Sequence, residues 1–283
     1  MKLFVGGTRG THVVADPAFN HYGGDTTCYL VEGAKGERII IDAGSGLRNV
    51  ESRWRHESVG ACTILLTHYH LDHLIGLPSF GPLYRSDWAI EIAAPRLGST
   101  EPHTVVRGLF AKPLWPVQIE QLKANLRFRT LPADGMTGRA LGGLHYRWCA
   151  VHHPGGCMAY RVDEEATGAS VVVATDFEWA ETSVAERAPL LELCRTPRPV
   201  DLLLADGHYT PDNYDRVRGW GHSRWSDCVE LAHAAAAWRL RVIHHAPDSS
   251  DNHLTAVESA VREALPGSGL LKQGRELASG TEA

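Results

Sequence analysis

The sequence of 283 residues predicts an α/β protein, and two observations support this class. First, short apolar runs rich in Val and Ile recur along the chain, as is typical of buried strands. Second, helix-like stretches lie among these runs, and residues 251–265 repeat apolar side chains at helical spacing. The length fits one large domain or two small ones, and it is sufficient to bury a substantial core.

The predicted elements follow in chain order. Strands are expected at residues 2–5, 28–31, 38–41, 63–66, 89–93, 126–131, 144–151, 170–174, 201–206 and 240–243, with a closing strand at 270–277. Helices are expected at 71–77, in the run that ends at Trp238, and at 251–265 with Asp251 or Asn252 as the cap. We interpret residues 78–132 as an irregular elaboration beside the site, within a single domain of residues 1–283 whose last few residues fray.

Composition limits the classes of function. The net charge is −5 and no basic block appears, which argues against nucleic acid as a partner, because phosphate contacts need clustered Lys and Arg. Six scattered cysteines without a C-x-x-C pair indicate free thiols in reducing cytoplasm. The sequence shows neither a signal peptide nor an apolar run of membrane-spanning length, so we expect a cytoplasmic protein without a membrane partner.

Three histidines and one aspartate crowd into the segment after the strand at residues 63–66. Imidazole and carboxylate groups are ligands that suit zinc, iron and manganese. His68 and His70 are two positions apart, so their side chains point the same way at an extended strand end. Asp72 and His73 follow where the chain turns, and they can point toward a second ion. This one segment can therefore begin two metal sites.

The run His-Tyr-His-Leu-Asp-His at residues 68–73 resembles the His-x-His-x-Asp-His signature of the metallo-β-lactamase superfamily. That resemblance implies a four-layered αβ/βα sandwich with a dinuclear metal site at one edge. It also implies three further ligands in the order His, Asp, His, each at the end of a strand.

Residues of these types follow in that order. His153 stands directly before Pro-Gly, as in the resembling families, with His152 as the alternative. Asp176 closes the strand at 170–174 and is the carboxylate expected to bridge both ions. His244 stands three residues before a Pro, with His245 as the alternative. The resemblance thus implies that the chain holds two divalent ions, zinc by default and manganese or iron otherwise. One ion would be held by His68, His70 and His153, and the other by Asp72, His73 and His244.

Two later histidines are candidates for the pocket. His222 lies in a glycine-flanked loop, Gly-Trp-Gly-His-Ser, before a helix-like run. Phosphodiesterases of the superfamily, including tRNA 3′-processing enzymes and cyclic phosphodiesterases, have a His-Ser-type motif here that assists the leaving group, and His222 matches it. The alternative is an incidental His beside a helix-capping Ser223. His208, after the strand at 201–206, either lines the pocket or lies at the surface.

The N-terminal loops at residues 7–10 and 22–27 resemble bacterial superfamily proteins described as cyclic-phosphate or cyclic-nucleotide phosphodiesterases. Arg9 in the first loop is a candidate for binding phosphate, with a structural salt bridge as the alternative. The Gly-rich arm by which tRNA-processing relatives grip tRNA is not evident. Nor is the cysteine-rich zinc site of phosphonate-pathway phosphodiesterases.

These observations predict a dinuclear metal-dependent hydrolase that cleaves a small phosphodiester, such as a cyclic nucleotide or a cyclic sugar phosphate, with Asp72 and His222 at the catalytic centre. The alternatives are a lactonase or thioesterase of the same fold, a tRNA 3′-processing endonuclease, or a binding protein without catalysis. A homodimer is compatible with the sequence, which does not fix the oligomeric state.

Overall fold

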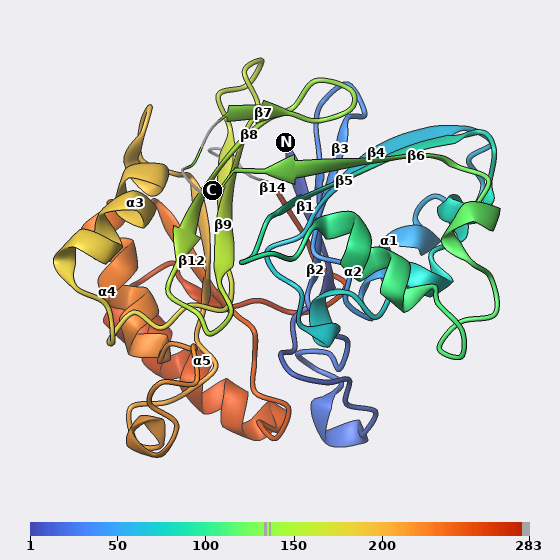
Figure 1. Ribbon diagram of the computed structural model, residues 1–283. Helices are drawn as coiled ribbons and strands as arrows, with labels where there is room; N and C mark the ends of the chain where they lie inside the picture. The colour runs from blue at the N-terminus through green and yellow to red at the C-terminus, as the bar shows by residue number, and fades with distance from the viewer. Residues whose placement is uncertain (133–134, 136, 279–283) are drawn as a thin grey trace.

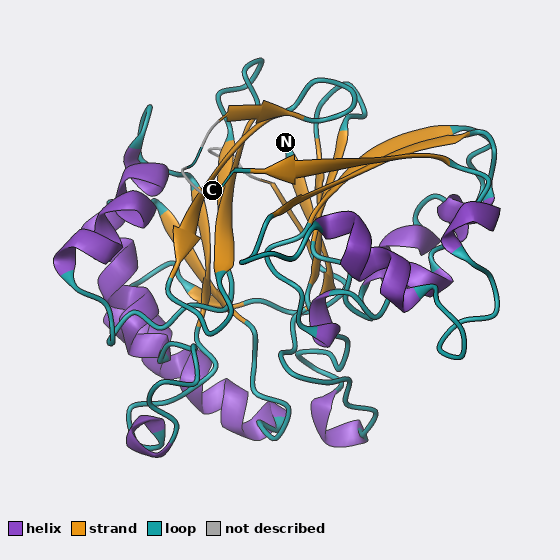
Figure 2. Cartoon of the chain, viewed as in Figure 1, coloured by secondary structure: helices purple, strands orange, loops and turns teal. Residues whose placement is uncertain are grey.

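The computed structural model describes residues 1–132, 135 and 137–278. Two seven-stranded sheets lie face to face, and the longer helices cover their outer faces (Figures 1 and 2). The first sheet has the order β14 (Glu276–Ala278), β1 (Lys2–Gly7), β2 (Cys28–Glu32), β3 (Arg38–Ile41), β4 (Gly60–Leu65), β5 (Trp88–Pro95), β6 (Asn125–Leu131). The second has the order β13 (Gly269–Leu270), β12 (Arg239–Ile243), β11 (Leu202–Asp206), β10 (Ser170–Ala174), β9 (Cys157–Asp163), β8 (His145–Val151), β7 (Thr137–Arg139).

The helices divide between the two outer faces, as the flanks of Figure 1 show. On the first sheet lie α1 (Leu47–Ser52) and α2 (Pro102–Leu109). On the second lie α3 (Val184–Arg195), α4 (Trp225–Ala235) and α5 (Asp251–Ala264). The resulting order of helix, sheet, sheet, helix confirms the predicted four-layered αβ/βα sandwich. Within the described residues, no helix combines the length and the apolar character needed to cross a membrane.

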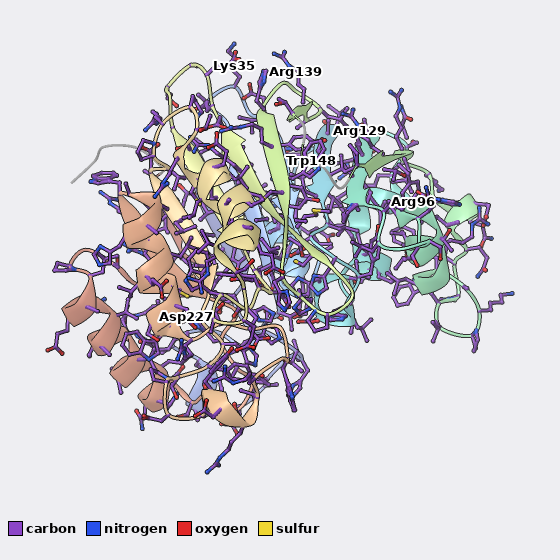
Figure 3. The ribbon with its side chains drawn as sticks, turned by 60° about the vertical axis from the view of Figure 1, so that its left-hand side comes forward. Lys35, Arg96, Arg129, Arg139, Trp148 and Asp227 are labelled. Carbon is purple, nitrogen blue, oxygen red and sulfur yellow. The ribbon has the colours of Figure 1, made fainter. Side chains whose placement is uncertain are left out.

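Central strands of each sheet, such as β3 and β10, are buried on both faces, which explains the continuous apolar runs in the sequence. In β3, Ile39 and Ile41 pack between the sheets, whereas Ile40 packs under the helices of the first sheet. Trp148 on β8, labelled in Figure 3, belongs to the layer between the sheets, and its Nε1 donates to the carbonyl of Pro132 (2.7 Å).

Strand direction brings the functional loops to one edge. Strands β3 to β6 run parallel to one another, as do β10 to β13. Two antiparallel steps make β1 parallel to β3, and likewise β8 parallel to β10. Carboxyl ends of parallel strands share one edge of a sheet, and in open α/β sheets that edge is where ligands bind. The segments predicted to hold metal follow the carboxyl ends of β4, β8, β10 and β12.

Several predicted elements differ in the structure. Residues 71–77 do not form a helix but begin with a single 3-10 turn, Leu71–His73, because the backbone of Ala43 bonds to His73 and Gly76 on either side of it. Segment 78–132 contains the two strands predicted in it, but they are β5 and β6 of the first sheet, and the segment also contains α2, which was not predicted. The closing strand is split into β13 and β14, one in each sheet. The predicted frayed end at 279–283 lies outside the described residues.

Helix α5 is capped one residue earlier than predicted. The side chain of Ser250 accepts a hydrogen bond from the backbone N–H of His253, so Ser250 is the N-cap. Asp251 instead accepts from the backbone N–H groups of His21 and Tyr22, and it ties the helix to the N-terminal loops.

We therefore expect Ser250→Ala to lower the free energy of unfolding by about 1 kcal/mol, because the orphaned N–H loses its acceptor. Urea unfolding followed by circular dichroism measures this change. Asn252→Ala, at an exposed position in the first turn, is the matched control and should leave the midpoint unchanged. A larger loss for Asn252→Ala than for Ser250→Ala would contradict this assignment of the cap.

Candidate metal centre

The structure brings the predicted ligand residues into two adjoining groups. His68, His70, His153 and Asp176 each offer one ligand atom, and these atoms lie within 4.8 Å of one another. Asp72, His73 and His244 form a second group under the same condition. His70 is exposed at the pocket, whereas the other six side chains are buried.

Asp176 stands between the two groups with one oxygen toward each. Its Oδ1 lies 3.2 Å from His73 Nε2 and 3.3 Å from His244 Nε2. Its Oδ2 lies 3.7 Å from His68 Nε2 and 4.0 Å from His153 Nε2. The side chain is almost wholly buried, so its negative charge needs compensation from within the site. This geometry allows a single carboxylate to serve both groups.

The outer nitrogens of three of the imidazoles, those of His68, His73 and His153, contact oxygen atoms. His73 Nδ1–H donates to Asp42 Oδ2 (2.8 Å), and His153 Nδ1–H donates to the carbonyl of Gly221 (2.9 Å). His68 Nδ1 lies 3.0 Å from Thr67 Oγ1, whose own hydroxyl donates to Asp42. Such bonds fix the tautomer and aim the Nε2 lone pair inward, as they do around metal-binding histidines.

The inward-facing nitrogens fit metal ions. Within the described residues, the Nε2 atoms of His68, His73 and His244 are buried and make no hydrogen bond. Burial lowers the pKa of His68, and it also lowers the pKa values of His70 and His153 below the usual range. These imidazoles are therefore neutral, which is the form that binds metal. Buried lone pairs without a proton donor, set around shared carboxylates, are what a divalent cation requires.

The negative charge of nearby carboxylates governs the electrostatics of the second group. Burial lowers the pKa of His73, but the charges of Asp176, Asp72 and Asp42 outweigh that effect and raise it well above its usual range. Asp72 Oδ2 lies 3.3 Å from His73 Nε2 and 3.4 Å from His244 Nε2, and it accepts the backbone N–H of Thr11 (2.7 Å). This part of the protein attracts positive charge, which either a proton on His73 or a metal ion supplies.

The structure distinguishes the neighbouring histidines that the sequence left open. His153 joins the first group and its Nε2 lies 3.3 Å from His70 Nδ1, whereas His152 is exposed. His244 faces Asp176, whereas His245 Nε2–H donates to the carbonyl of Leu271 (2.9 Å), away from the two groups.

The backbone is strained at this site. Thr11, Asp42, Asp176 and His244 have φ values of 68°, 60°, 50° and 59°, which a side chain disfavours by roughly 1–2 kcal/mol each. Only one other non-glycine residue in the described part of the chain, Ala236 at the end of α4, has a positive φ. Strain gathered in this way is typical of functional sites, where the surrounding structure over-determines the backbone.

His222 lies beside both groups and pairs with a buried carboxylate. Its Nδ1–H donates to Asp206 Oδ2 (2.8 Å), which leaves Nε2 free. Burial lowers the pKa of His222, but Asp206, with smaller contributions from Asp176 and Asp72, raises it to about 9. Ser223 does not cap α4, because Arg224 is the N-cap. His222 is therefore held in its protonated form at neutral pH.

His208 and Arg9, the two predicted substrate-binding residues, occupy different places. His208 lines the pocket beside His222, with ring centroids 4.6 Å apart, and its Nδ1–H donates to the carbonyl of His244. Arg9 is fully buried, and its guanidinium donates to the carbonyls of Gly23, Ala246 and Ser249. Arg9 thus ties loops together in the described structure and is not among the residues that line the pocket.

The sequence analysis did not select three carboxylates that orient the site. Asp42 and Asp206 each close a predicted strand, and that position was the available signal. Glu178 gave no signal, since its partners lie about 40 residues away. Its buried carboxylate accepts the backbone N–H groups of Gly219 (2.6 Å) and Gly221 (2.8 Å), and so fixes the loop that carries His222.

A pocket of about 680 Å³ opens above the two groups. Its floor includes His70, Asp72, Asp176, His222 and His244. Its volume lies within the range of ordinary small-molecule sites.

Two adjoining His/carboxylate groups that share one carboxylate, placed at the carboxyl edge of a four-layered sandwich, define a metal-dependent hydrolase. Residues 37–245 match the family model described as the Beta-lactamase superfamily domain, and the chain therefore belongs to the metallo-β-lactamase superfamily.

Individual relatives agree with this family. The chain is 23% identical to ribonuclease Z of Clostridium tetani (strain Massachusetts / E88), in an alignment that covers 77% of this chain and 82% of that protein. The crystal structure of the short form of human tRNase Z (ELAC1) has a TM-score of 0.70 at 16% identity, covering 99% of this chain and 100% of that one. A new diphosphatase from the PhnP family has a TM-score of 0.68 at 18% identity, with coverage of 98% and 97%. At such identities the structural likeness shows the fold.

Gly10 offers a test of the second group, because a Cβ there would overlap the imidazole of His244. We expect Gly10→Ala to displace that ring and to weaken metal binding roughly 10- to 100-fold, as loss of a supporting contact does. Titration with zinc after chelation, with metal content read by mass spectrometry, measures the effect. Gly108→Ala, where a Cβ would meet open space within α2, is the control. Equal zinc affinity in both variants would contradict this role of Gly10.

Proposed function

We propose that this protein is a dinuclear metal-dependent phosphodiesterase that acts on a small phosphodiester. One ion would be held by His68, His70 and His153, the other by Asp72, His73 and His244, with Asp176 between them. The histidine-rich donor set favours zinc, although manganese and iron accept the same ligands. Two such ions would supply a water-derived nucleophile at neutral pH and Lewis acidity toward a phosphoryl oxygen.

The observation that carries the proposal is the Asp206–His222 pair beside the two groups. Hydrolysis of a phosphodiester joins a water oxygen to phosphorus and breaks the P–O bond to an alkoxide, which needs a proton. His222 holds a proton on Nε2, because Asp206 accepts its Nδ1–H and raises its pKa to about 9. His222 therefore donates that proton to the leaving oxygen, and Asp206 is the positioning residue.

Three other activities are the alternatives to this proposal. A lactonase or thioesterase would use the same two groups, but thiolate leaving groups depart without a proton, so the Asp206–His222 pair would have no function in a thioesterase. Cleavage of tRNA precursors is suggested by the name of the ribonuclease Z relative. The net charge of −5 disfavours such a polyanion, because binding one requires clustered basic residues.

The cysteines support a reducing compartment, and we infer a cytoplasmic location from them. All six are buried free thiols. Thiols persist unpaired where glutathione and thioredoxin keep them reduced.

Replacing His222 tests the proposal directly. We expect His222→Ala to lower kcat for a cyclic nucleotide by about 10²-fold or more, because the leaving oxygen loses its proton donor. Metal content should be unchanged, and a chelator should abolish the activity of the wild type. The measurement is a panel of 2′,3′- and 3′,5′-cyclic nucleotides, a chromogenic phosphodiester, a lactone, a thioester and a tRNA precursor.

The same panel identifies the alternatives. Turnover of lactone or thioester that is equal in wild type and His222→Ala would exclude the phosphodiesterase proposal. Cleavage of the tRNA precursor in preference to all cyclic nucleotides would show that the substrate is RNA and not a small phosphodiester.

The pH dependence tests the role of Asp206. His222 can donate only in its protonated form, and the charge of Asp206 raises its pKa, so phosphodiester cleavage should decline as the pH rises through that pKa. In Asp206→Asn the carboxylate charge is lost, the pKa of His222 falls, and the decline should begin at lower pH. Profiles of kcat/KM from pH 6 to about pH 10 measure this shift. If Asp206→Asn lowers kcat/KM equally at every pH and does not move the decline at high pH, then Asp206 supports the structure of the site and does not tune the pKa of His222.

A further inference from the structure

The loop that carries His222 also presents an exposed tryptophan to the pocket. Trp220 lines the pocket and is 64% exposed. No ring or cation stacks on it within the described part of the chain. Large apolar side chains are ordinarily buried, and leaving one in water forgoes roughly 1.5–3 kcal/mol. An indole left uncovered beside a reaction centre therefore calls for a partner from outside the protein.

Hydrogen bonds hold the backbone of the loop that carries Trp220 in place. Glu178, itself fully buried, accepts the N–H of Gly219 on one side of Trp220 and the N–H of Gly221 on the other. The hydroxyl of Tyr214 donates to the same carboxylate (2.6 Å). The backbone is thus fixed on both sides of the indole, two residues before His222. Such preorganisation lowers the entropic cost of binding a flat ligand.

The other half of the molecule contributes a second exposed apolar side chain to the pocket. Leu71 follows β4 of the first sheet, lines the same pocket and is 59% exposed. Trp220 follows β11 of the second sheet. Two uncovered apolar side chains from opposite sheets, both beside the reaction centre, fit a planar aromatic ring.

The charges of the residues that line the pocket restrict which charged groups the substrate can carry besides the phosphodiester. None of the described residues that line it is Lys or Arg, whereas Asp72, Asp176 and Asp248 are acidic. Arg9, the nearby cation, is engaged with backbone carbonyls. Bound ions would compensate the charge of one phosphodiester, but a further phosphate would meet the exposed carboxylate of Asp248, with no Lys or Arg among the described lining residues to offset the repulsion.

We propose that Trp220 stacks on an aromatic ring of the substrate, so that the pocket selects phosphodiesters which carry one planar ring and no additional phosphate. This inference rests on the proposed phosphodiesterase function and names its substrate class. A nucleobase and a simple aryl group both provide the ring. The test distinguishes them from substrates without one.

The experiment compares a 2′,3′-cyclic nucleotide with the cyclic phosphate of ribose that lacks the base. In Trp220→Ala, kcat/KM for the nucleotide should fall roughly 5- to 150-fold, the range of one lost base stack, through KM rather than kcat. The substrate without a base should be unaffected. Trp220→Phe should retain most of the activity, and Trp238→Ala, at an exposed tryptophan outside the pocket, is the control.

Two kinetic outcomes would overturn the proposal. An equal fall for both substrates would mean that Trp220 supports the loop and not the ligand. No change for either substrate would mean that the indole makes no contact. A phenyl phosphodiester assayed beside its methyl counterpart shows whether an aryl group suffices or a nucleobase is needed.

Binding without turnover separates this inference from the phosphodiesterase proposal. A cyclic nucleotide phosphorothioate should quench tryptophan fluorescence in the wild type, and Trp220→Ala should lose both the quenching and most of the affinity. If the wild type hydrolyses no phosphodiester yet binds the analogue through Trp220, the phosphodiesterase proposal is rejected and the stacking proposal is retained. Binding that is unchanged in Trp220→Ala overturns the stacking.

Asp248 provides an independent measurement of the charge argument. The wild type should prefer a cyclic nucleotide without a 5′-phosphate over the same compound with one. Asp248→Asn should reduce that preference several-fold, because the repulsion at the rim is lost. A wild type that prefers the 5′-phosphorylated compound would overturn this part of the proposal.

Discussion

The carboxylate of Asp176 is the interaction on which the rest of the site depends. It is buried, it follows strand β10 of the second sheet, and its two oxygens face different groups of histidines. Two of its partners, His68 and His73, come from the first sheet, and two, His153 and His244, come from the second. A buried charge shared in this way is tolerable only if both sheets hold their loops in fixed positions. The four-layered sandwich meets that requirement, because both edges are backed by buried strands.

The histidine side chains of this site are oriented by residues that lie behind them, away from the pocket. Asp42 reaches His73 directly and His68 through Thr67. Asp206 and Glu178 act in the same manner on His222, one through the ring and the other through the backbone. Carboxylates placed behind imidazoles decide which nitrogen faces the pocket and how basic it is. The chemistry of the inner atoms therefore depends on residues that never touch a substrate.

Local patterns made the buried strands and the first ligand segment predictable from the sequence, whereas the four-layered arrangement was implied by the family resemblance. Continuous apolar runs such as residues 38–41 identify strands buried on both faces, and the spacing of His68 and His70 places two imidazoles on one side of the chain. The family resemblance supplied the order of the later ligands. Hydrogen bonds between residues far apart in the sequence determine the features that the sequence did not predict. Ala43 prevents a helix after the histidine-rich segment, and Glu178 bonds to a loop about 40 residues away. No spacing within a short window encodes either contact.

The strained backbone at the site has a thermodynamic consequence. Thr11, Asp42, Asp176 and His244 hold left-handed conformations that an unfolded chain is free to leave. This strain therefore subtracts from the stability of the fold. An ion that binds Asp176 and His244 only in the native state would add to it by mass action. Metal binding would thus be coupled to folding, and the lifetime of the protein in a cell would depend on the local supply of metal.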